Sequence, residues 1–558
     1  MTKYRGYDSL DADARQWVDD TLAGLDAAGR IAQVLAPFVT SWGSPDENPI
    51  FLEPGIEARV GVAFLTPGHD LAAQRDAARQ MQAACDIPPL FCSDYEFGPT
   101  VDGAVKFPAA MAAGAIADGA RGEELAYQAG AAAARQAAAT GVTWTFSPVI
   151  DLPLDPDSPV THMRAYHRDS DRIIALANAY IRGCQEHGMA ATVKHFPGDG
   201  ADRRDQHLVT VSNPLSAADW RARYGRCYAE TIEAGVMTVM PGHIAQRELA
   251  SRDADGRALP ASIDRVMLED VLRGELGFEG LIVSDAINMF GVRNRCTDTF
   301  EACIRAFNAG CDVVLFPPHA PTTAEAFAKA LSEGTISEDR LEQAVRRVLS
   351  LKAALGLHRR NPLCSDEQIP AVLNDPAAEQ TSRDVSAEAL TLLRGDGRVP
   401  MKLQPGDRVL VVDAPNEQAR PSEIELAGGD GSCQPLTEAL RRRGLEPVVV
   451  RTIQELNQNE PDCQAVIYVF NVRPSAFRGS VRLSWAAISC LNYDVILSPK
   501  PVACLAAGNP FGAWELEPVP NVVCTYGDAP ACQEAAVAAL LGEADFPGTL
   551  PVELPITG

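Results

Sequence analysis

The sequence has few cationic side chains for its size, and this scarcity limits the partners it can have. Lysine and arginine together number 49, against 74 aspartate and glutamate residues, and the net charge is -25. A strongly acidic surface repels nucleic-acid phosphates and anionic membrane surfaces. One basic run, Arg441 to Arg443, ends an expected helix, where cations complement the helix dipole. We therefore expect neither a nucleic-acid nor a membrane partner.

Long apolar runs are also missing. No stretch reaches the roughly 18 apolar residues that a bilayer-spanning helix needs. The opening residues, MTKYRGYDSLDADARQWVDD, hold neither an apolar run of signal-peptide length nor a small-residue cleavage site. The 14 cysteines include no C-x-x-C pair, and many lie in apolar runs, which is typical of reduced, buried thiols. We expect a soluble protein that acts in the cytoplasm.

Signals for a metal ion or a nucleotide cofactor are lacking as well. Cysteines and histidines show no zinc-ligand spacing. No Gly-rich phosphate loop of the Walker or G-x-G-x-x-G type stands between a strand and a helix. We expect no cofactor and no metal. A metal site formed by His195, Asp199 and His207 remains an alternative, although the H-x-H strand end of many metal-dependent barrels is absent.

What the chain does have is a regular alternation of apolar runs and helical stretches. Up to about residue 355, each apolar run ends in polar or turn residues and is followed by a stretch rich in helix formers. Continuous apolar runs suit parallel strands that are buried on both faces. Eight repeats of strand and helix predict a (β/α)8 barrel of the TIM type. The runs are 31–37, 60–65, 89–93, 142–148, 190–194, 236–240, 281–284 and 312–316.

A change of pattern divides the chain in two. Residues 357–380 carry Pro, Asn and Asp without a strong period, so we expect a linker there. It would join a catalytic barrel domain of residues 1–356 to a C-terminal domain of residues 381–558. The second domain is expected to be a smaller three-layer α/β sandwich. Its strand-like runs are 408–412, 447–450, 465–470, 502–505 and 521–526, and its helical stretches include 434–443 and 531–541.

Polar side chains gather where the expected barrel strands end, which is where barrels place their catalytic residues. A charged group directly after a buried strand costs stability unless it is paired or used. Several such groups on one rim predict a polar pocket. The groups are Asp94, Glu96, Asp151, Lys194, His195, His243 and Asp285.

The segment after the fifth run, KHFPGDGADRRDQH, brings an acid and a histidine close together. Asp205 and His207 are two residues apart, and such residues share one side of an extended chain. The carboxylate could then fix the imidazole tautomer and stabilise the imidazolium. This pair is suited to general acid–base catalysis, and an inert, salt-bridged loop is the alternative.

Several segments together resemble glycoside hydrolase family 3. KHFPGDGADRRDQH and GLIVSDAINM look like its two signature segments, and TFSPVIDLPLDP, HMRAYHRD, AGVMTVMPGHI and LTLLRGDGRVP look like further ones. The bacterial β-N-acetylglucosaminidases are the most similar branch. The resemblance covers nearly the whole chain and implies a TIM-type barrel followed by an α/β sandwich.

The resemblance also implies roles for individual residues. Asp285 matches the nucleophile of the family, and Asp205 with His207 matches the acid/base dyad of the N-acetylglucosaminidase branch. Positions that hold sugar hydroxyls, or line the pocket, are matched by Asp94, Arg164, Lys194, His195 and His243. Three departures surround the substrate and leave the sugar open. They are Phe97 in place of a glycine, Asp199 in place of the histidine of G-H-G, and Ala165-Tyr166 in place of S-F.

The implied activity is removal of a terminal β-linked N-acetylglucosamine with retention of configuration. Asp285 would attack the anomeric carbon and form a covalent glycosyl-enzyme. His207 would protonate the leaving oxygen and then deprotonate the incoming water. The partner implied is therefore a β-linked oligosaccharide or glycoside.

Three other functions remain open. The family includes β-glucosidases that draw a glutamate acid/base from the second domain, although the corresponding loop here, GGDGSCQ at 428–434, holds no glutamate. Phosphate could replace water as the acceptor, since an acid/base that is not an anion tolerates phosphate better than a carboxylate does. The third is an inactive sugar-binding protein. The oligomeric state, with a homodimer among the options, and any contribution of the second domain to the site are open too.

Overall fold

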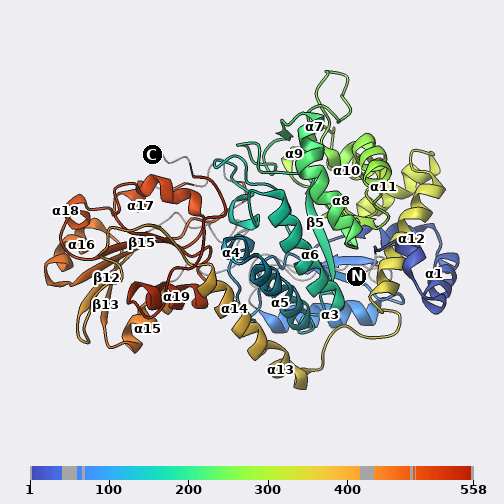
Figure 1. The fold of residues 1–558 in the computed structure, drawn as a ribbon. Coiled ribbons are helices and arrows are strands. Elements are labelled where there is room, and N and C mark those ends of the chain that lie inside the picture. The colour runs from blue at the N-terminus through green and yellow to red at the C-terminus, as the bar shows by residue number, and fades with distance from the viewer. Residues whose placement is uncertain are drawn as a thin grey trace. The chain divides into compact units, whose positions relative to one another are not determined.

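The computed structural model describes residues 3–39, 60–65, 70–414, 433–474, 476–477, 482–483 and 485–554. The chain divides into two compact units, shown with their elements in Figure 1. The first unit comprises residues 1–104, 130–152 and 177–375, and the second comprises 105–129, 153–176 and 376–558. Two segments from the first half of the sequence therefore belong to the second unit. The stretch 357–380 contains η6 (Asp366–Gln368), α13 (Ile369–Leu373) and the start of α14 (Pro376–Glu388).

The first unit contains the eight expected parallel strands. Six of them form one sheet in chain order, and the last strand pairs with the first. Parallel bridges from Phe38 to Phe64 and from Val283 to Val313 join the two groups, so the strands close into a barrel. The predicted (β/α)8 architecture is confirmed. The strands are β1 (Leu35–Ala36), β2 (Val62–Phe64), β3 (Leu90–Ser93), β4 (Trp144–Thr145), β5 (Ala190–Phe196), β7 (Thr238–Pro241), β9 (Leu281–Ile282) and β10 (Val314–Leu315).

Helices surround these strands, and polar caps fix where several of them begin. Asp70 caps α3 (Leu71–Ala84), Asp298 caps α10 (Thr299–Ala309) and Ser337 caps α12 (Glu338–Ala354), each by accepting a backbone N–H of the first turn. α12 packs beside α1 (Ala12–Gly24), so the two ends of the barrel sequence meet, as Figure 1 shows in yellow and blue. The remaining helices of residues 1–375 are α2 (Ala27–Gln33), α4 (Ala110–Ala115), α5 (Gly119–Ala137), α6 (Ser170–Glu186), α7 (Ala217–Trp220), α8 (Arg226–Glu233), α9 (Phe290–Arg293) and α11 (Ala320–Ser332).

The interior of the barrel is a packed core. Phe64, Trp144, Phe146, Met240 and Leu281 belong to one buried cluster. The indole N–H of Trp144 donates to the hydroxyls of two neighbouring strands, on Thr192 and Thr238. Burial of an indole is favourable when its N–H finds such a partner. The strands are thereby held in a fixed register, which gives the side chains at their ends fixed positions.

The second unit holds a six-stranded sheet in the order β11-β16-β15-β14-β12-β13. Adjacent strands are parallel, except that β11 runs antiparallel to β16. The predicted α/β sandwich is confirmed, but β11 is not among the strands predicted from the sequence. The strands are β11 (Thr391–Arg394), β12 (Arg408–Asp413), β13 (Glu446–Val450), β14 (Ala465–Phe470), β15 (Val502–Ala506) and β16 (Val522–Cys524).

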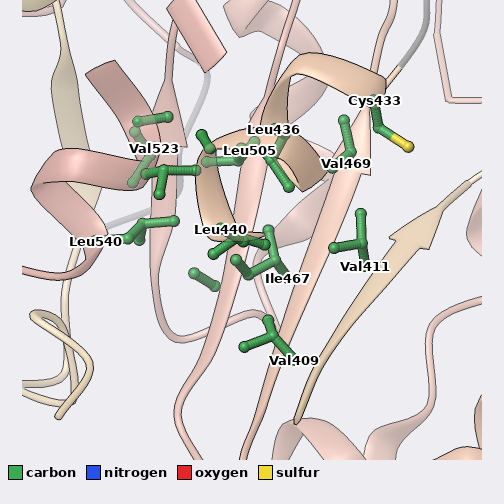
Figure 2. Packing of buried hydrophobic residues seen from close by; sticks show 14 of the residues in the cluster. Val409, Val411, Cys433, Leu436, Leu440, Ile467, Val469, Leu505, Val523 and Leu540 are labelled. Carbon is green, nitrogen blue, oxygen red and sulfur yellow. The ribbon is translucent and has the colours of Figure 1, made fainter. Parts of the chain in front are cut away.

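Apolar side chains of two helices cover this sheet. Leu436 and Leu440 of α15 (Gln434–Arg442) and Leu540 of α19 (Pro530–Leu540) pack in one cluster with strand residues such as Val409 and Ile467. Figure 2 shows these side chains converging between the helices and the strands. Among the described residues, every helix is too short or too polar to cross a membrane.

Candidate active site

Asp285 lies just beyond β9, at the carboxyl end of the barrel. Its backbone N–H donates to Pro241 O, and its Oδ1 accepts the N–H of Ala286 at 2.7 Å. The residue is 9% exposed. Burial by itself raises the pKa of the carboxyl, but positive charge on three nearby imidazoles more than offsets this effect, and the pKa ends below its ordinary value of 3.8. The carboxylate is thus kept ionised, as a nucleophile must be. The imidazoles belong to His195, His243 and His207.

Asp205 and His207 form the pair that the sequence predicts. Oδ1 of Asp205 accepts the backbone N–H of His207 at 2.8 Å and lies 2.6 Å from its Nδ1. The aspartate side chain is fully buried, whereas the imidazole keeps 12% of its surface exposed. A carboxylate at Nδ1 makes this nitrogen a donor, so proton exchange with a substrate falls to Nε2.

The loop that carries this pair is anchored on two sides. Oε1 of Gln206 accepts the backbone N–H of His243, and the N–H of Phe290 donates to His207 O at 3.0 Å. Gly291 permits this close approach, because a Cβ there would stand 2.3 Å from Gln206 O. Gln206 is not among the site residues predicted from the sequence. Its only signal was its place between the two members of the pair.

A second Asp–His pair joins the loop after β4 to β5. Oδ2 of Asp151 lies 2.7 Å from Nδ1 of His195, while its Oδ1 accepts the backbone N–H groups of His195 and Asp199. Both side chains are buried. The predicted site includes His195 but not Asp151, which the sequence marked only as one of the rim carboxylates. This single carboxylate fixes both the histidine and the turn that follows it.

Lys194 is held between two carboxylates at the end of β3. Its Nζ lies 2.9 Å from Oδ1 of Asp94 and 2.8 Å from Oε1 of Glu96. The lysine is buried and the Glu96 side chain is 9% exposed, whereas the Asp94 side chain is 44% exposed. The structure therefore brings the predicted Asp94 and Lys194 together and adds Glu96. Asp94, as the more exposed carboxylate, is better placed to meet a sugar hydroxyl.

His243 is buried beside the residue that follows Asp285. Its Nε2 lies 3.0 Å from Ala286 O, and its Nδ1 lies 2.8 Å from the hydroxyl of Ser262. Burial lowers its pKa below the ordinary value, and the nearby charge of Asp285 opposes this effect. When the ring is neutral, Nε2–H donates to Ala286 O and Nδ1 accepts from Ser262. The ring thus braces the backbone that follows Asp285.

Arg164 belongs to the second unit, whereas the other predicted site residues belong to the first. It ends η2 (His162–Arg164), is buried, and donates to Val160 O. In the same unit, the side-chain amide of Asn509 lies 2.9 Å from Nδ1 of His162. Arg473 and Asn471 both contact Asp528. In the loop 428–434, which corresponds to the segment that supplies a glutamate in β-glucosidases of the resembled family, residues 428–432 lie outside the described residues.

The described residues give the metal alternative no ligand set. Within the described ranges, no group of three or more His, Cys, Asp and Glu side chains could hold a metal ion. The two histidines of that alternative, His195 and His207, instead direct Nδ1 to Asp151 and Asp205 respectively.

The amino-acid sequence is similar to that of a known protein family and of individual bacterial enzymes. Residues 60–351 match the family described as "Glycosyl hydrolase family 3 N terminal domain". A β-N-acetylglucosaminidase/β-glucosidase of Cellulomonas fimi is 31% identical over 98% of this chain and 97% of its own length. A β-hexosaminidase of Nitrosospira multiformis is 34% identical over 46% of this chain and 72% of its own length.

Solved structures of similar proteins cover nearly the whole chain. A β-glucoside phosphorylase is 27% identical with a TM-score of 0.85, and the match covers 99% of this chain and 98% of that one. A family 3 β-N-acetylglucosaminidase of Paenibacillus sp. has a TM-score of 0.82 at 23% identity, covering 96% of this chain and 100% of that one. At that identity, the second likeness speaks for the fold alone.

Proposed function

Because the chain belongs to glycoside hydrolase family 3, we propose that it removes terminal β-linked N-acetylglucosamine with retention of configuration. The observation that carries the proposal is the Asp205–His207 pair, with Nδ1 of the imidazole 2.6 Å from a fully buried carboxylate. It supplies an acid/base from the barrel itself. The relative from Cellulomonas fimi carries the N-acetylglucosaminidase activity in its name.

The reaction follows in two steps. In the first, the Asp285 carboxylate attacks the anomeric carbon, the bond from that carbon to the leaving oxygen breaks, and Nε2 of His207 gives its proton to this oxygen. In the second, the same nitrogen takes a proton from water as the water attacks the anomeric carbon and releases Asp285. Two inversions give net retention. Asp205 stabilises His207 whenever it is an imidazolium.

The neighbouring side chains would hold the sugar. Lys194, fixed between Asp94 and Glu96, offers a cation with the partly exposed Asp94 beside it. His195, fixed by Asp151, offers its Nε2 edge. The role in sugar binding that the resemblance implies for Arg164 remains a proposal, as do a cytoplasmic place of action and a homodimer.

The test is an assay of the p-nitrophenyl β-N-acetylglucosaminide and β-glucoside side by side, with Asp285→Asn as the control. We expect a higher kcat/KM for the acetylated sugar, and a loss of at least about 10³-fold in the variant because no nucleophile remains. A preference for the glucoside would retain the nucleophile and reject the sugar. Full activity of the variant would reject Asp285.

Transfer to phosphate is the second candidate. It is favoured by the similarity to a β-glucoside phosphorylase over nearly the full length of both chains. It is also favoured by an imidazole acid/base, which repels an attacking phosphate less than a carboxylate does. Phosphate would attack the glycosyl-enzyme in place of water and release a sugar 1-phosphate. Phosphorus NMR of the products, with and without phosphate, decides between the two acceptors.

A further inference from the structure

Two large apolar side chains are exposed beside the acid/base histidine. Among the described residues of the first unit, the exposed large hydrophobic side chains are Leu208, at 39%, and Phe290, at 56%. Leu208 follows His207 directly in the chain. The backbone N–H of Phe290 donates to His207 O. Among the described residues of this unit, both exposed large apolar residues are therefore linked to His207 through the backbone, Leu208 by the peptide bond and Phe290 by a hydrogen bond.

The backbone under these side chains is firmly held. Phe290 begins α9, and the flanking Met289 and Val292 are buried. The next carbonyl, Gly291 O, accepts a hydrogen bond from the Thr210 hydroxyl at 2.6 Å. The N–H of Leu208 donates to Asp205 O at 3.0 Å. The two exposed apolar side chains therefore stand on backbone that is held by hydrogen bonds and by buried neighbours.

The chemistry of His207 decides what these side chains meet. A general acid must lie within hydrogen-bond reach of the leaving oxygen, so whatever is bonded to that oxygen extends past the imidazole. The transferred sugar lies on the other side of the same oxygen, toward Asp285. The segment that carries His207 also carries exposed apolar surface, which is available to a leaving group at the imidazole. Covering this exposed apolar area with a flat apolar face of the leaving group lowers the free energy of binding.

We propose that Phe290 and Leu208 form an apolar platform for the leaving group, which makes the enzyme selective for β-glycosides whose aglycone presents a flat apolar face. The inference rests on the proposed roles of Asp285 and His207. It does not depend on which sugar is transferred. Phe290 is the larger and more exposed of the two and carries most of the selectivity.

The test compares benzyl and methyl β-glycosides of whichever sugar the wild-type enzyme cleaves. Benzyl alcohol and methanol are similarly weak acids, so the two substrates make similar demands on His207 and differ in the surface they offer. We expect Phe290→Ala to lower kcat/KM for the benzyl glycoside by about fivefold to tenfold. The methyl glycoside should change by less than about twofold, and Phe290→Tyr should retain the preference. Leu208→Ala should show a smaller loss of the same kind.

Leu497→Ala provides the matched control. Leu497 is 79% exposed in the second unit, and its replacement should leave both substrates unchanged. A second readout is the trapping of the glycosyl-enzyme by benzyl alcohol, because the acceptor must occupy the same place. Phe290→Ala should lower the share of benzyl glycoside among the products.

The outcomes separate this inference from the proposed function. Equal losses for benzyl and methyl glycosides, or an unchanged share of trapped product, would overturn the platform while leaving the hydrolase intact. A reversed preference between the acetylated sugar and glucose would overturn the proposed substrate and leave the benzyl-to-methyl comparison valid. Association of the protein through this surface, lost in Phe290→Ala without change in the benzyl-to-methyl ratio, would assign the surface to a protein partner and reject the platform.

Discussion

The first unit holds two Asp–His pairs of nearly equal hydrogen-bond length but different surroundings. Nδ1 lies 2.7 Å from its carboxylate in Asp151–His195 and 2.6 Å in Asp205–His207. Asp151 uses both oxygens and accepts two backbone N–H groups besides the imidazole. Asp205 uses Oδ1 alone, and its Oδ2 is buried without a hydrogen-bond partner among the described residues.

This difference separates positioning from proton transfer. A buried carboxylate that is fully hydrogen bonded is stabilised where it stands and holds its partners in place. A buried carboxylate short of donors is costly as an anion and interacts more strongly with a cation beside it. Asp205 is therefore suited to stabilise positive charge on the imidazole beside it. Under the proposed mechanism, the same two residue types serve as a fixed support in one pair and as an acid/base in the other.

The largest effect should come from removing the imidazole of the second pair. His207→Ala should lower kcat/KM by about 10²- to 10⁴-fold for the methyl β-glycoside, whose leaving group needs a proton. The loss should nearly vanish for a dinitrophenyl glycoside, whose leaving group departs as an anion. With the dinitrophenyl glycoside, azide should restore the turnover of the variant, since azide attacks the glycosyl-enzyme without the help of a base.

His195→Ala is the matched comparison. It should reduce kcat/KM for both substrates by a similar factor and should show no response to azide, because in the proposed mechanism His195 holds the sugar and exchanges no proton. If the dependence on the leaving group appeared in His195→Ala instead, the two pairs would have exchanged roles.

An intermediate effect should separate the two aspartates by stability. In Asp151→Asn, the amide N–H₂ must face a donor, so one buried hydrogen bond is lost at a cost of about 1–3 kcal/mol. In Asp205→Asn, the amide N–H₂ can take the place of Oδ2, and every hydrogen bond of Oδ1 survives. Its stability should change by less than about 0.5 kcal/mol, while its activity falls.

Thermal unfolding of the two variants, measured beside kcat/KM on the same preparations, gives the readout. The comparison holds if Asp151→Asn melts at the lower temperature and Asp205→Asn melts near the wild type with reduced activity. Equal melting temperatures would show that the unbonded Oδ2 makes no difference to the fold.

The two pairs also show how far sequence alone can reach. Asp205 and His207 are two residues apart, so local geometry sufficed to predict their contact. Asp151 lies in the loop after β4 and His195 lies on β5, so their contact depends on the register of β4 against β5 and on the path of that loop. The sequence placed both at strand ends but could not match them. The contact of Lys194 with Glu96 and that of Phe290 with His207 were out of reach for the same reason.

The fold shows the same division. Buried parallel strands were readable because each is a continuous apolar run, and all eight barrel strands fall on such runs. β11 escaped because it is a half-buried antiparallel strand at the edge of its sheet, directly after α14, with a short run that helices also tolerate. That residues 105–129 and 153–176 pack with the second unit follows from tertiary contacts alone.

The smallest effect concerns the acid side of the pH profile. Positive charge on His195, His243 and His207 holds the pKa of Asp285 below 3.8 in spite of burial. A nucleophile works as the anion, so activity governed by Asp285 should persist as the pH falls to that lowered pKa and be lost beneath it. Removing one cation raises the pKa of the carboxyl, so His195→Asn should move the acid limb of kcat/KM to higher pH.

His187→Asn is the control, because that ring contacts Gly183 O on another part of the barrel. The measurement is the position of the limb, which is separate from the lower plateau that His195→Asn also causes. An acid limb that stayed in place would mean that His195 acts on the sugar alone, and that the first pair contributes position without charge.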